Sequence, residues 1–331
     1  MAKSKRIGQE TQEDIFVSAV IATAGDGVRL SGYVTKLSRV MAVHYTNYEI
    51  IVVDNGTEPT EIKALTKLLV KVPCLRIISL SQRERYDTAV FAGLDSAIGD
   101  YVCTLNPAVD PIDAIPDIIR ENQRTDAVQG VSRVPIKSAF GSQLGRRLFY
   151  WYNRKYIGID IPLNATYFAS YNRAVVNAVT ATSRSHRHIR HLVRAVGYQP
   201  VRFTYQPMSN PASQRTLKTG VIEALEIAAS YSTHPLRFVT WLGFFAGIIN
   251  ILYVVYVIMV NLTKSHVTEG WTTTSLQLSG MFFILFATMV ILAEYIGRIL
   301  IESRHEPQYY VRDEKSSSVG LADRFRRNIE R

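Results

Sequence analysis

Up to residue 105, the chain alternates short apolar runs with segments of helical spacing. Four runs rich in β-branched residues have the length of strands, at residues 16–23, 49–54, 75–80 and 100–105. Between them, apolar residues recur every three or four positions, most clearly at 29–44 and 87–98. Runs without polar alternation are typical of parallel strands covered on both faces. The pattern therefore predicts an α/β domain with an open, mostly parallel, Rossmann-like sheet over residues 15–215.

The C-terminal third holds two apolar segments that are long enough to cross a bilayer. Residues 238–260 contain no charged residue, and residues 276–301 are apolar until Glu294 and Arg298; about 20 such residues span the hydrocarbon core. The connecting loop holds one Lys and one Glu, whereas the outer flanks are basic. The positive-inside rule therefore predicts an integral, two-pass membrane protein with both termini in the cytoplasm.

Polar or amphipathic segments flank these regions. The N-terminal tail, residues 1–14, lacks the apolar core of a signal peptide, which agrees with a cytoplasmic first domain. A juxtamembrane helix is expected at 216–237 and a polar cytoplasmic tail at 302–331. Residues 141–158 mix aromatic and basic side chains, which suits an interfacial helix lying on the bilayer. An ordinary buried helix with a basic outer face fits that segment nearly as well.

The net charge of +10 is concentrated in two blocks. Residues 133–159 carry six Lys or Arg, residues 184–218 carry seven with three His, and neither block contains an acid. Such blocks favour an anionic partner, which could be nucleic acid, anionic lipid or a phosphorylated substrate, although a solvated basic face explains them too. Because no nucleic-acid recognition motif is visible and membrane spans follow, we expect anionic lipid or lipid phosphate, and no nucleic acid.

Candidate chemistry lies where the predicted parallel strands end, since ligands of open α/β sheets bind at that edge. Asp54 closes the apolar strand 49–54, where its carboxylate could accept hydrogen bonds from a ribose hydroxyl or a base. The run Asp54, Asn55, Gly56 is equally good turn chemistry, so Asp54 could instead cap a turn. No glycine-rich dinucleotide fingerprint and no Walker A sequence appears, which argues against a dinucleotide or ATP enzyme.

Five segments carry a resemblance to a known family: AVFAGLDSAIGDYV at 89–102, DPIDAIPDII at 110–119, LFYWYNRKYIGIDIP at 148–162, THPLRFVTWLG at 233–243 and AEYIGRILIESRHEPQYYVRDE at 293–314. They resemble the polyprenyl-phosphate glycosyltransferases of family 2, which include dolichyl-phosphate mannose synthases and the bacterial enzymes that load glucose or aminoarabinose on undecaprenyl phosphate. The resemblance implies a GT-A fold, a nucleotide-sugar donor, a Mg²⁺ or Mn²⁺ ion, a polyprenyl-phosphate acceptor reached from the cytoplasmic face, and a bacterial inner membrane.

The resemblance also suggests residues for the site. Arg190 and Lys218 fall where the family binds phosphate, with Arg215 as a neighbour, although each could be a snorkelling surface charge. Where relatives have Pro-Val-Tyr-Asn-Glu, Asp26 is the one acidic residue of this chain, and where relatives have two adjacent aspartates, Asp54 is the one that remains. Both are expected to contact the nucleotide. The metal motif Asp-Ala-Asp corresponds to residues 105–107, which are Leu, Asn and Pro, so Asp110 is the remaining candidate metal ligand.

These departures leave two hypotheses open. The chain could be an active transferase that moves a sugar from a nucleotide to a polyprenyl phosphate, with little use of metal or with Asp54 and Asp110 as substitute ligands. It could instead be a catalytically inactive relative that serves as a partner or regulatory subunit of a membrane enzyme. Small residues at 243, 246 and 247 would allow close helix packing and therefore a homo-oligomer.

Overall fold

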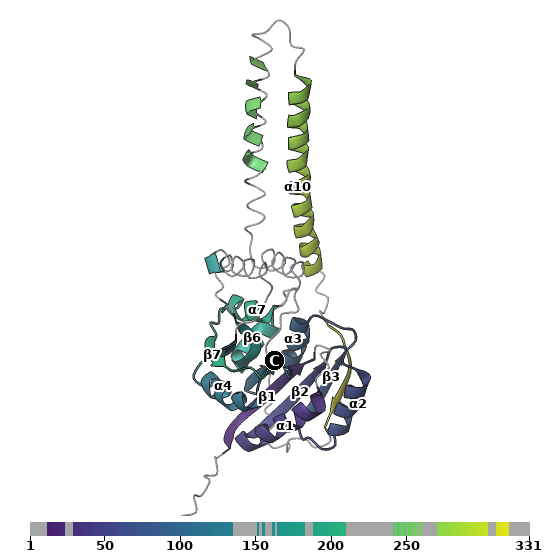
Figure 1. Cartoon of the computed structure of the whole chain (residues 1–331), viewed down its shortest axis with the longest axis vertical. Coiled ribbons are helices and arrows are strands. Elements are labelled where there is room, and N and C mark those ends of the chain that lie inside the picture. The colour runs from purple at the N-terminus through teal and green to yellow at the C-terminus, as the bar shows by residue number, and fades with distance from the viewer. Residues whose placement is uncertain are drawn as a thin grey trace, which may run out of the picture. The chain divides into compact units, whose positions relative to one another are not determined.

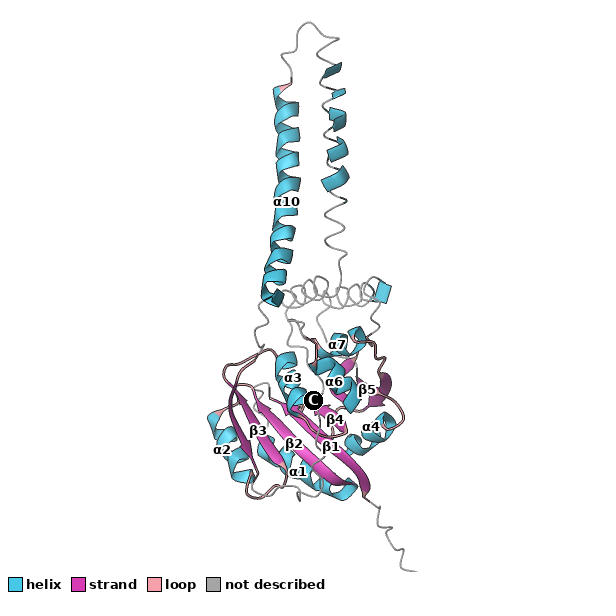
Figure 2. Ribbon diagram, turned by 180° about the vertical axis from the view of Figure 1, so that it is seen from behind, coloured by secondary structure: helices cyan, strands magenta, loops and turns pink. Residues whose placement is uncertain are grey.

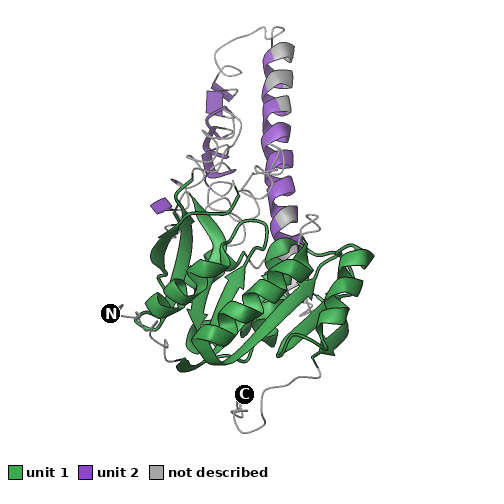
Figure 3. Ribbon diagram, turned by 60° about the horizontal axis from the view of Figure 1, so that its bottom comes forward, with its two compact units in different colours: residues 1–150, 159–215, 307–331 green, residues 151–158, 216–306 purple. Residues whose placement is uncertain are grey.

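The computed structural model describes residues 12–23, 29–134, 151, 154–155, 161–162, 164–182, 188–209, 270–303 and 309–317, together with most positions between 241 and 259. The chain divides into two compact units, which Figure 3 colours separately. The first comprises residues 1–150, 159–215 and 307–331, and the second comprises residues 151–158 and 216–306. Each unit is described by itself.

The first unit is built on one sheet, which has eight strands in the described residues, in the order β7-β5-β6-β4-β1-β2-β3-β8 (Figure 1). The strands are β1 (Glu13–Ala22), β2 (Tyr45–Asp54), β3 (Leu75–Leu80), β4 (Tyr101–Leu105), β5 (Ala127–Ser132), β6 (Ala165–Asn172), β7 (Val201–Tyr205) and β8 (Val311–Ser316). The pairs β1–β2, β1–β4, β2–β3 and β5–β7 are parallel, whereas β6 and β8 pair antiparallel with their neighbours. The predicted mostly parallel sheet is confirmed.

Helices cover both faces of this sheet (Figure 2). They are α1 (Leu30–His44), α2 (Pro59–Leu68), α3 (Tyr86–Ser96), the short 3₁₀ helix η1 (Ile112–Ala114), α4 (Ile115–Asn122), α6 (Arg173–Thr180) and α7 (Ile189–Ala195). One apolar core joins α1, α2 and α4 to one face, and a second joins α3, α6 and α7 to the other. Successive residues of β1 alternate between the two cores. This double burial explains why β1 to β4 appear in the sequence as unbroken apolar runs.

Gly93 lets helix α3 lie close to the sheet. A Cβ atom at this position would be 2.3 Å from Cγ1 of Val20 on β1 and 3.1 Å from Cγ2 of Val53 on β2. Such a contact is far inside van der Waals distance, so only glycine allows the observed helix-to-sheet packing. The close packing fixes the start of α3 beside the carboxyl ends of the parallel strands.

The C-terminal segment 302–331, expected as a polar tail, contains the edge strand β8. Every residue of β8 is exposed, and the strand pairs antiparallel with β3. Backbone bonds continue the pairing at both ends, from Ser81 N to Tyr310 O at 2.8 Å and from Ser317 N to Leu75 O at 2.7 Å. The pairing covers the edge that β3 would otherwise expose, which removes a template for unwanted strand association.

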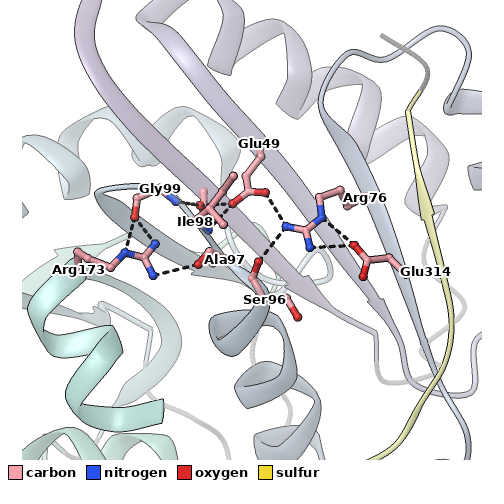
Figure 4. A network of polar contacts seen from close by, with 9 residues as sticks. Glu49, Arg76, Ser96, Ala97, Ile98, Gly99, Arg173 and Glu314 are labelled. Carbon is pink, nitrogen blue, oxygen red and sulfur yellow. Dashed lines mark hydrogen bonds and ion pairs between the residues drawn. The ribbon is translucent and has the colours of Figure 1, made fainter. Parts of the chain in front are cut away.

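A polar network joins β8 to the centre of the sheet (Figure 4). Glu49 on β2 is 3% exposed and accepts hydrogen bonds from the Ser18 hydroxyl at 2.6 Å, Ile98 N at 2.7 Å and Arg76 Nη1 at 2.9 Å. The same guanidinium donates to Glu314 of β8, with Nη2 2.8 Å from Oε1. The network therefore connects β1, β2, β3, the segment after α3, and β8 through a single buried carboxylate.

The second unit contains the long helix α10 (Trp271–Ser303). Its window Gly280–Gly297 has a mean hydropathy of 1.9 and is not buried; among the described residues it is the one helix segment with the length and composition to cross a membrane. It lies within the predicted span 276–301. A shorter apolar helix, Gly243–Tyr253, lies within the predicted span 238–260. The two-pass hairpin remains a prediction, and the expected juxtamembrane helix at 216–237 lies outside the described residues.

Candidate active site

Strands β1 to β4 are parallel, so their carboxyl ends meet at one edge of the sheet. Asp54 ends β2 at this edge and is 6% exposed. Its Oδ1 accepts a hydrogen bond from Thr57 N at 2.9 Å, and Gly56 between them has a φ of +80°. Asp54 therefore caps the turn that the Asp-Asn-Gly sequence allows. The cap holds the carboxylate in one orientation at the end of the strand.

Asn55 connects the turn after β2 to the loop after β3. Its Nδ2 donates to Glu84 O at 3.0 Å, and its Oδ1 accepts from Glu84 N at 2.7 Å. Asn55 N in turn donates to the hydroxyl of Thr23, next to the end of β1, at 3.0 Å. A carboxylate at position 55 could not donate to Glu84 O. The resembled family has a second aspartate at this position. In this chain the Asn55 amide instead joins the turn after β2 to the loop after β3.

Asp110, the candidate metal ligand, is fully buried within the fold. Its Oδ2 accepts from Asn106 N at 2.8 Å, its Oδ1 accepts from the hydroxyl of Tyr205, and its carbonyl accepts from the hydroxyl of Tyr33. Burial raises the pKa of Asp110 to about 7, although the bonds from Tyr205 and Asn106 act in the opposite direction. These contacts favour a structural role, in which Asp110 holds the loop after β4.

The remaining side chains after β4 are a poor set of metal ligands. Leu105 and Pro107 have no side-chain oxygen, and Oδ1 of Asn106 accepts from Ala108 N at 2.9 Å. Mg²⁺ and Mn²⁺ require several oxygen ligands. Across the part of the chain that the structure describes, no three His, Cys, Asp or Glu side chains gather as a metal site would need. The described residues therefore do not fit the divalent ion that the resemblance implies; Asp26 lies outside them.

A cationic cluster forms around the buried carboxylate of Asp87 in the first turn of α3. Oδ1 accepts from Ile189 N at 3.2 Å, Oδ2 accepts from the Tyr167 hydroxyl at 2.9 Å, and Oδ2 lies 3.4 Å from Nδ1 of His188. Burial alone would raise the pKa of Asp87, but the hydrogen bond with His188, the charge of Arg190 and the hydrogen bond from Tyr167 lower it to about 2. Asp87 is therefore a permanent negative centre that organises the side chains around it.

Arg190, expected at the acceptor phosphate, belongs to this cluster. Its guanidinium carbon lies 4.7 Å from the centre of the Tyr167 ring, and Nη1 donates to Ala165 O at 3.0 Å. Burial and the charge of Arg190 lower the pKa of the neighbouring His191 to about 3, so that imidazole is uncharged near neutral pH. Of the three predicted phosphate-binding residues, Arg190 is described; Arg215 and Lys218 lie outside the described residues.

Sequence reasoning did not single out Arg85 or Asp87, and it did not place Tyr167 and His188 beside them. Asp87 lies on α3 and Tyr167 on β6, whereas Arg85 and His188 directly precede α3 and α7 and are 103 positions apart in the chain. The one available signal was an acidic residue in the first turn of a predicted helix, which is common helix chemistry and indicates no ligand. Their meeting depends on the antiparallel return of β6 beside β4, which the apolar pattern did not predict.

Comparison with known proteins identifies the first unit. Residues 18–180 match the family model described as glycosyl transferase family 2. The chain contains a glycosyl transferase family 2 domain. The matched region runs from β1 to α6 of the sheet unit, and therefore contains the end of every one of the four central parallel strands. The family match agrees with the predicted GT-A type of α/β fold and supports a transferase.

The similarity to whole proteins extends beyond the glycosyl transferase family 2 domain. A bactoprenol glucosyl transferase of Shigella phage SfV is 28% identical over 273 residues, which are 81% of this chain and 88% of that protein. An uncharacterized glycosyltransferase of Synechocystis sp. is 24% identical over 90% of this chain and 95% of that protein. The prophage bactoprenol glucosyl transferase homolog of Escherichia coli K12 is 24% identical over 80% of this chain and 88% of that protein.

Solved structures with a related chain trace were also found. The glucosyl-3-phosphoglycerate synthase of Mycobacterium tuberculosis, in complex with Mn²⁺, uridine diphosphate and phosphoglyceric acid, is 15% identical with a TM-score of 0.48, over 65% of this chain and 77% of that chain. The mannosyltransferase PcManGT of Pyrobaculum calidifontis, in complex with GDP-mannose and Mn²⁺, is 13% identical with a TM-score of 0.44, over 68% of this chain and 65% of that chain.

Proposed function

We propose that this protein is a membrane glycosyltransferase that moves a sugar from a nucleotide-sugar donor to a polyprenyl phosphate at the cytoplasmic face. The observation that carries the proposal is the similarity to bactoprenol glucosyl transferases over about four fifths of the chain, which reaches beyond the family 2 domain. Bactoprenol is a polyprenol, so the named activity of those relatives joins a sugar to a lipid carrier. The apolar helix α10 supports access to such a carrier.

The chemistry of this transfer suits a cationic site without a strong base. The acceptor phosphate is an anionic nucleophile, so the protein has to hold two anions near each other and stabilise the departing nucleoside diphosphate. Arg190 is proposed for the acceptor phosphate, with Arg215 and Lys218 of the same basic block. Asp54 and Asp26 are proposed for the nucleotide. Because the described side chains do not fit a divalent ion, no step is assigned to a metal.

The proposed cellular setting follows from the same sequence features. Two spans, at 238–260 and 276–301, would place both termini and the first unit in the cytoplasm of a bacterium, at the inner membrane. The basic blocks would contact anionic lipid there. Close packing of the small residues in the first span would support a homo-oligomer.

The second candidate is a catalytically inactive partner or regulatory subunit of a membrane enzyme. It is favoured by the loop after β4, where Leu105 and Pro107 offer no ligand and the Asp110 carboxylate is buried in structural hydrogen bonds. This candidate keeps the fold and the basic surface but assigns no turnover to the chain. It differs from the first in one measurable property, since an inactive subunit need not bind a nucleotide.

The deciding experiment is calorimetric titration of UDP and GDP into the purified full chain in detergent, followed by sugar transfer to undecaprenyl phosphate. The variant Asp54→Asn keeps an oxygen for the Thr57 cap but removes the charge, and we expect it to weaken nucleotide binding at least about 10-fold. Asp117→Ala is the matched control, because that side chain is 62% exposed on α4. If the folded protein binds neither nucleotide and transfers no sugar, the transferase proposal is wrong.

A further inference from the structure

Arg85 is held by a relay that begins at the buried Asp87. Nη2 of Arg85 lies 3.2 Å from Nε2 of His188, and Nδ1 of His188 lies 3.4 Å from Oδ2 of Asp87. A guanidinium only donates hydrogen bonds, so Nε2 accepts and the ring proton lies on Nδ1, facing the carboxylate. His188 is 8% exposed and Asp87 is also 8% exposed, whereas Arg85 is exposed. The relay therefore runs from a buried anion to an exposed cation.

The relay fixes the direction of a side chain that is otherwise long and flexible. An exposed arginine loses rotamer entropy when it binds an anion, and a preformed contact removes part of that cost. Orientation of one residue by a buried histidine and carboxylate is a common way of preparing a polar group for a ligand. A surface arginine that served only solubility would not need this support.

Arg85 also lies beside the proposed nucleotide site. The loop that precedes it is joined to Asn55 by the two hydrogen bonds of Glu84, and Asn55 directly follows Asp54. Arg83 of the same loop packs on the turn, since a Cβ on Gly56 would be 3.5 Å from three of its side-chain carbons. On the other side of the relay, Tyr167 O accepts from Thr104 on β4 at 2.6 Å. The cluster is therefore bounded by the ends of β2 and β4.

The geometry points to an inference that rests on the proposed function: Arg85, positioned by His188 and Asp87, binds the donor diphosphate and supplies the charge that a divalent ion would otherwise supply. The diphosphate is the recognised group, because planar guanidinium donors match phosphate oxygens. One arrangement accounts for two separate observations: the residues after β4 are poor metal ligands, and Arg85 is held in a fixed direction. The site would hold its donor by arginine charge in the absence of divalent ions.

The balance of the transfer agrees with this role. The bond between the anomeric carbon and the oxygen of the terminal donor phosphate breaks, and its electron pair leaves with the nucleoside diphosphate. An oxygen of the acceptor phosphate forms the new bond to that carbon. No proton has to move, and the negative charge that grows is on the leaving diphosphate. A fixed cation at that place lowers the barrier because its interaction strengthens as the charge develops.

The first test measures UDP binding to the full chain in detergent with EDTA and again with Mn²⁺. We expect similar affinity in both conditions. Arg85→Ala should weaken UDP binding about 10- to 100-fold and UMP binding much less, since UMP lacks the terminal phosphate. Arg85→Lys should recover part of the loss, because it keeps the charge but not the planar fork. The matched control is Arg124→Ala, at an exposed position shortly after the end of α4, and it should leave UDP binding unchanged.

The second test examines the positioning residue. His188→Gln places an amide oxygen near the position of Nε2 and can still accept from Arg85, whereas His188→Ala cannot. We expect His188→Ala to raise the KM for the nucleotide sugar, and His188→Gln to restore it in part. A merely structural role would lower the unfolding midpoint of both variants without separating their KM values.

The outcomes separate this inference from the proposed function. If UDP binds and sugar is transferred only when Mn²⁺ is present, and Arg85→Ala binds UDP as tightly as the unmodified chain, the inference is wrong and the transferase proposal stands. If UDP binds in EDTA and the affinity depends on Arg85 but no sugar is transferred, the result supports the diphosphate site and favours the inactive-subunit candidate over the transferase. If neither UDP nor GDP binds in either condition and no sugar is transferred, both proposals fail.

Discussion

Glu49 and Glu314 bind the same guanidinium, but removing them should have very different consequences. The Glu49 side chain is 3% exposed, while that of Glu314 is 42% exposed, and Arg76 lies between them. Glu49→Ala would leave the Ser18 hydroxyl and Ile98 N without their acceptor in the interior, and Nη1 of Arg76 would keep only its bond to Ser96 O. Glu314→Ala would leave Arg76 paired with Glu49 and with Ser96 O.

The magnitudes follow from the burial of each carboxylate. Breaking a buried ion pair by removing one partner costs about 3–5 kcal/mol. A surface pair contributes roughly 0–1 kcal/mol. For a unit of this size, 1 kcal/mol shifts the unfolding midpoint by about 2–4 °C. We therefore expect a loss of roughly 6–20 °C for Glu49→Ala and at most about 4 °C for Glu314→Ala, with Glu49→Gln between them because it keeps one acceptor oxygen.

The assay should report on the first unit alone. All three tryptophans, at 151, 241 and 271, belong to the second unit, whereas both cysteines belong to the first. Cys74 is partly exposed and Cys103 is fully buried on β4, so the additional labelling by a thiol-reactive fluorogenic dye that follows exposure of Cys103 reports the unfolding of the sheet during heating of the full chain in detergent. Far-UV circular dichroism, which also reads helix α10 of the second unit, provides a check on the whole chain. Equal losses for Glu49→Ala and Glu314→Ala would refute the argument from burial.

Three further predictions use the same assay or hydrogen exchange. Gly93→Ala should lower the midpoint, because overpacking against Val20 costs about 1–3 kcal/mol and outweighs the gain in helix propensity, whereas Gly32→Ala, with nothing within 4 Å, should raise it. Burial raises the pKa of Asp110 to about 7, above its value in the unfolded chain, so the folded state binds more protons than the unfolded state between about pH 4 and 7 and its free energy of unfolding falls as pH rises through that range. Asp110→Asn should therefore flatten the decline of the unfolding midpoint from pH 5 to 8. An unchanged dependence of the midpoint on pH would contradict the raised pKa. Ending the chain at residue 308 removes β8 and should speed amide exchange in β3, with β6 unaffected as the internal reference.

The central strands could be predicted from the sequence because their burial is complete. Residues of β1 and β2 pack into cores on both faces, and this double packing requires unbroken apolar runs. Strand β8 could not be predicted in this way, since its residues are all exposed and its stability comes from backbone hydrogen bonds with β3. Such bonds are available to almost any sequence, so they leave no apolar period to detect.

The candidate site was predictable only in part for the same reason. Asp54 was found because it ends a recognisable strand, and Arg190 because the family resemblance marked it. The roles of Asn55 and Asp110 depend on partners from other loops, such as Glu84 and Tyr205, whose approach is set by packing. A residue type at a strand end therefore indicates a place for chemistry, while its hydrogen bonds decide whether it is available for that chemistry.

The sequence by itself determined the parallel α/β core, the apolar segments near the C-terminus and the basic blocks, because residue type and spacing directly determine which positions can be buried and where charge lies. The tertiary structure alone decided that Arg85, His188 and Asp87 form one relay and that Asp110 is buried in structural hydrogen bonds. These arrangements join residues that are far apart in the chain. Their energies depend on distance and desolvation, which exist only once the sheet has brought its strand ends together.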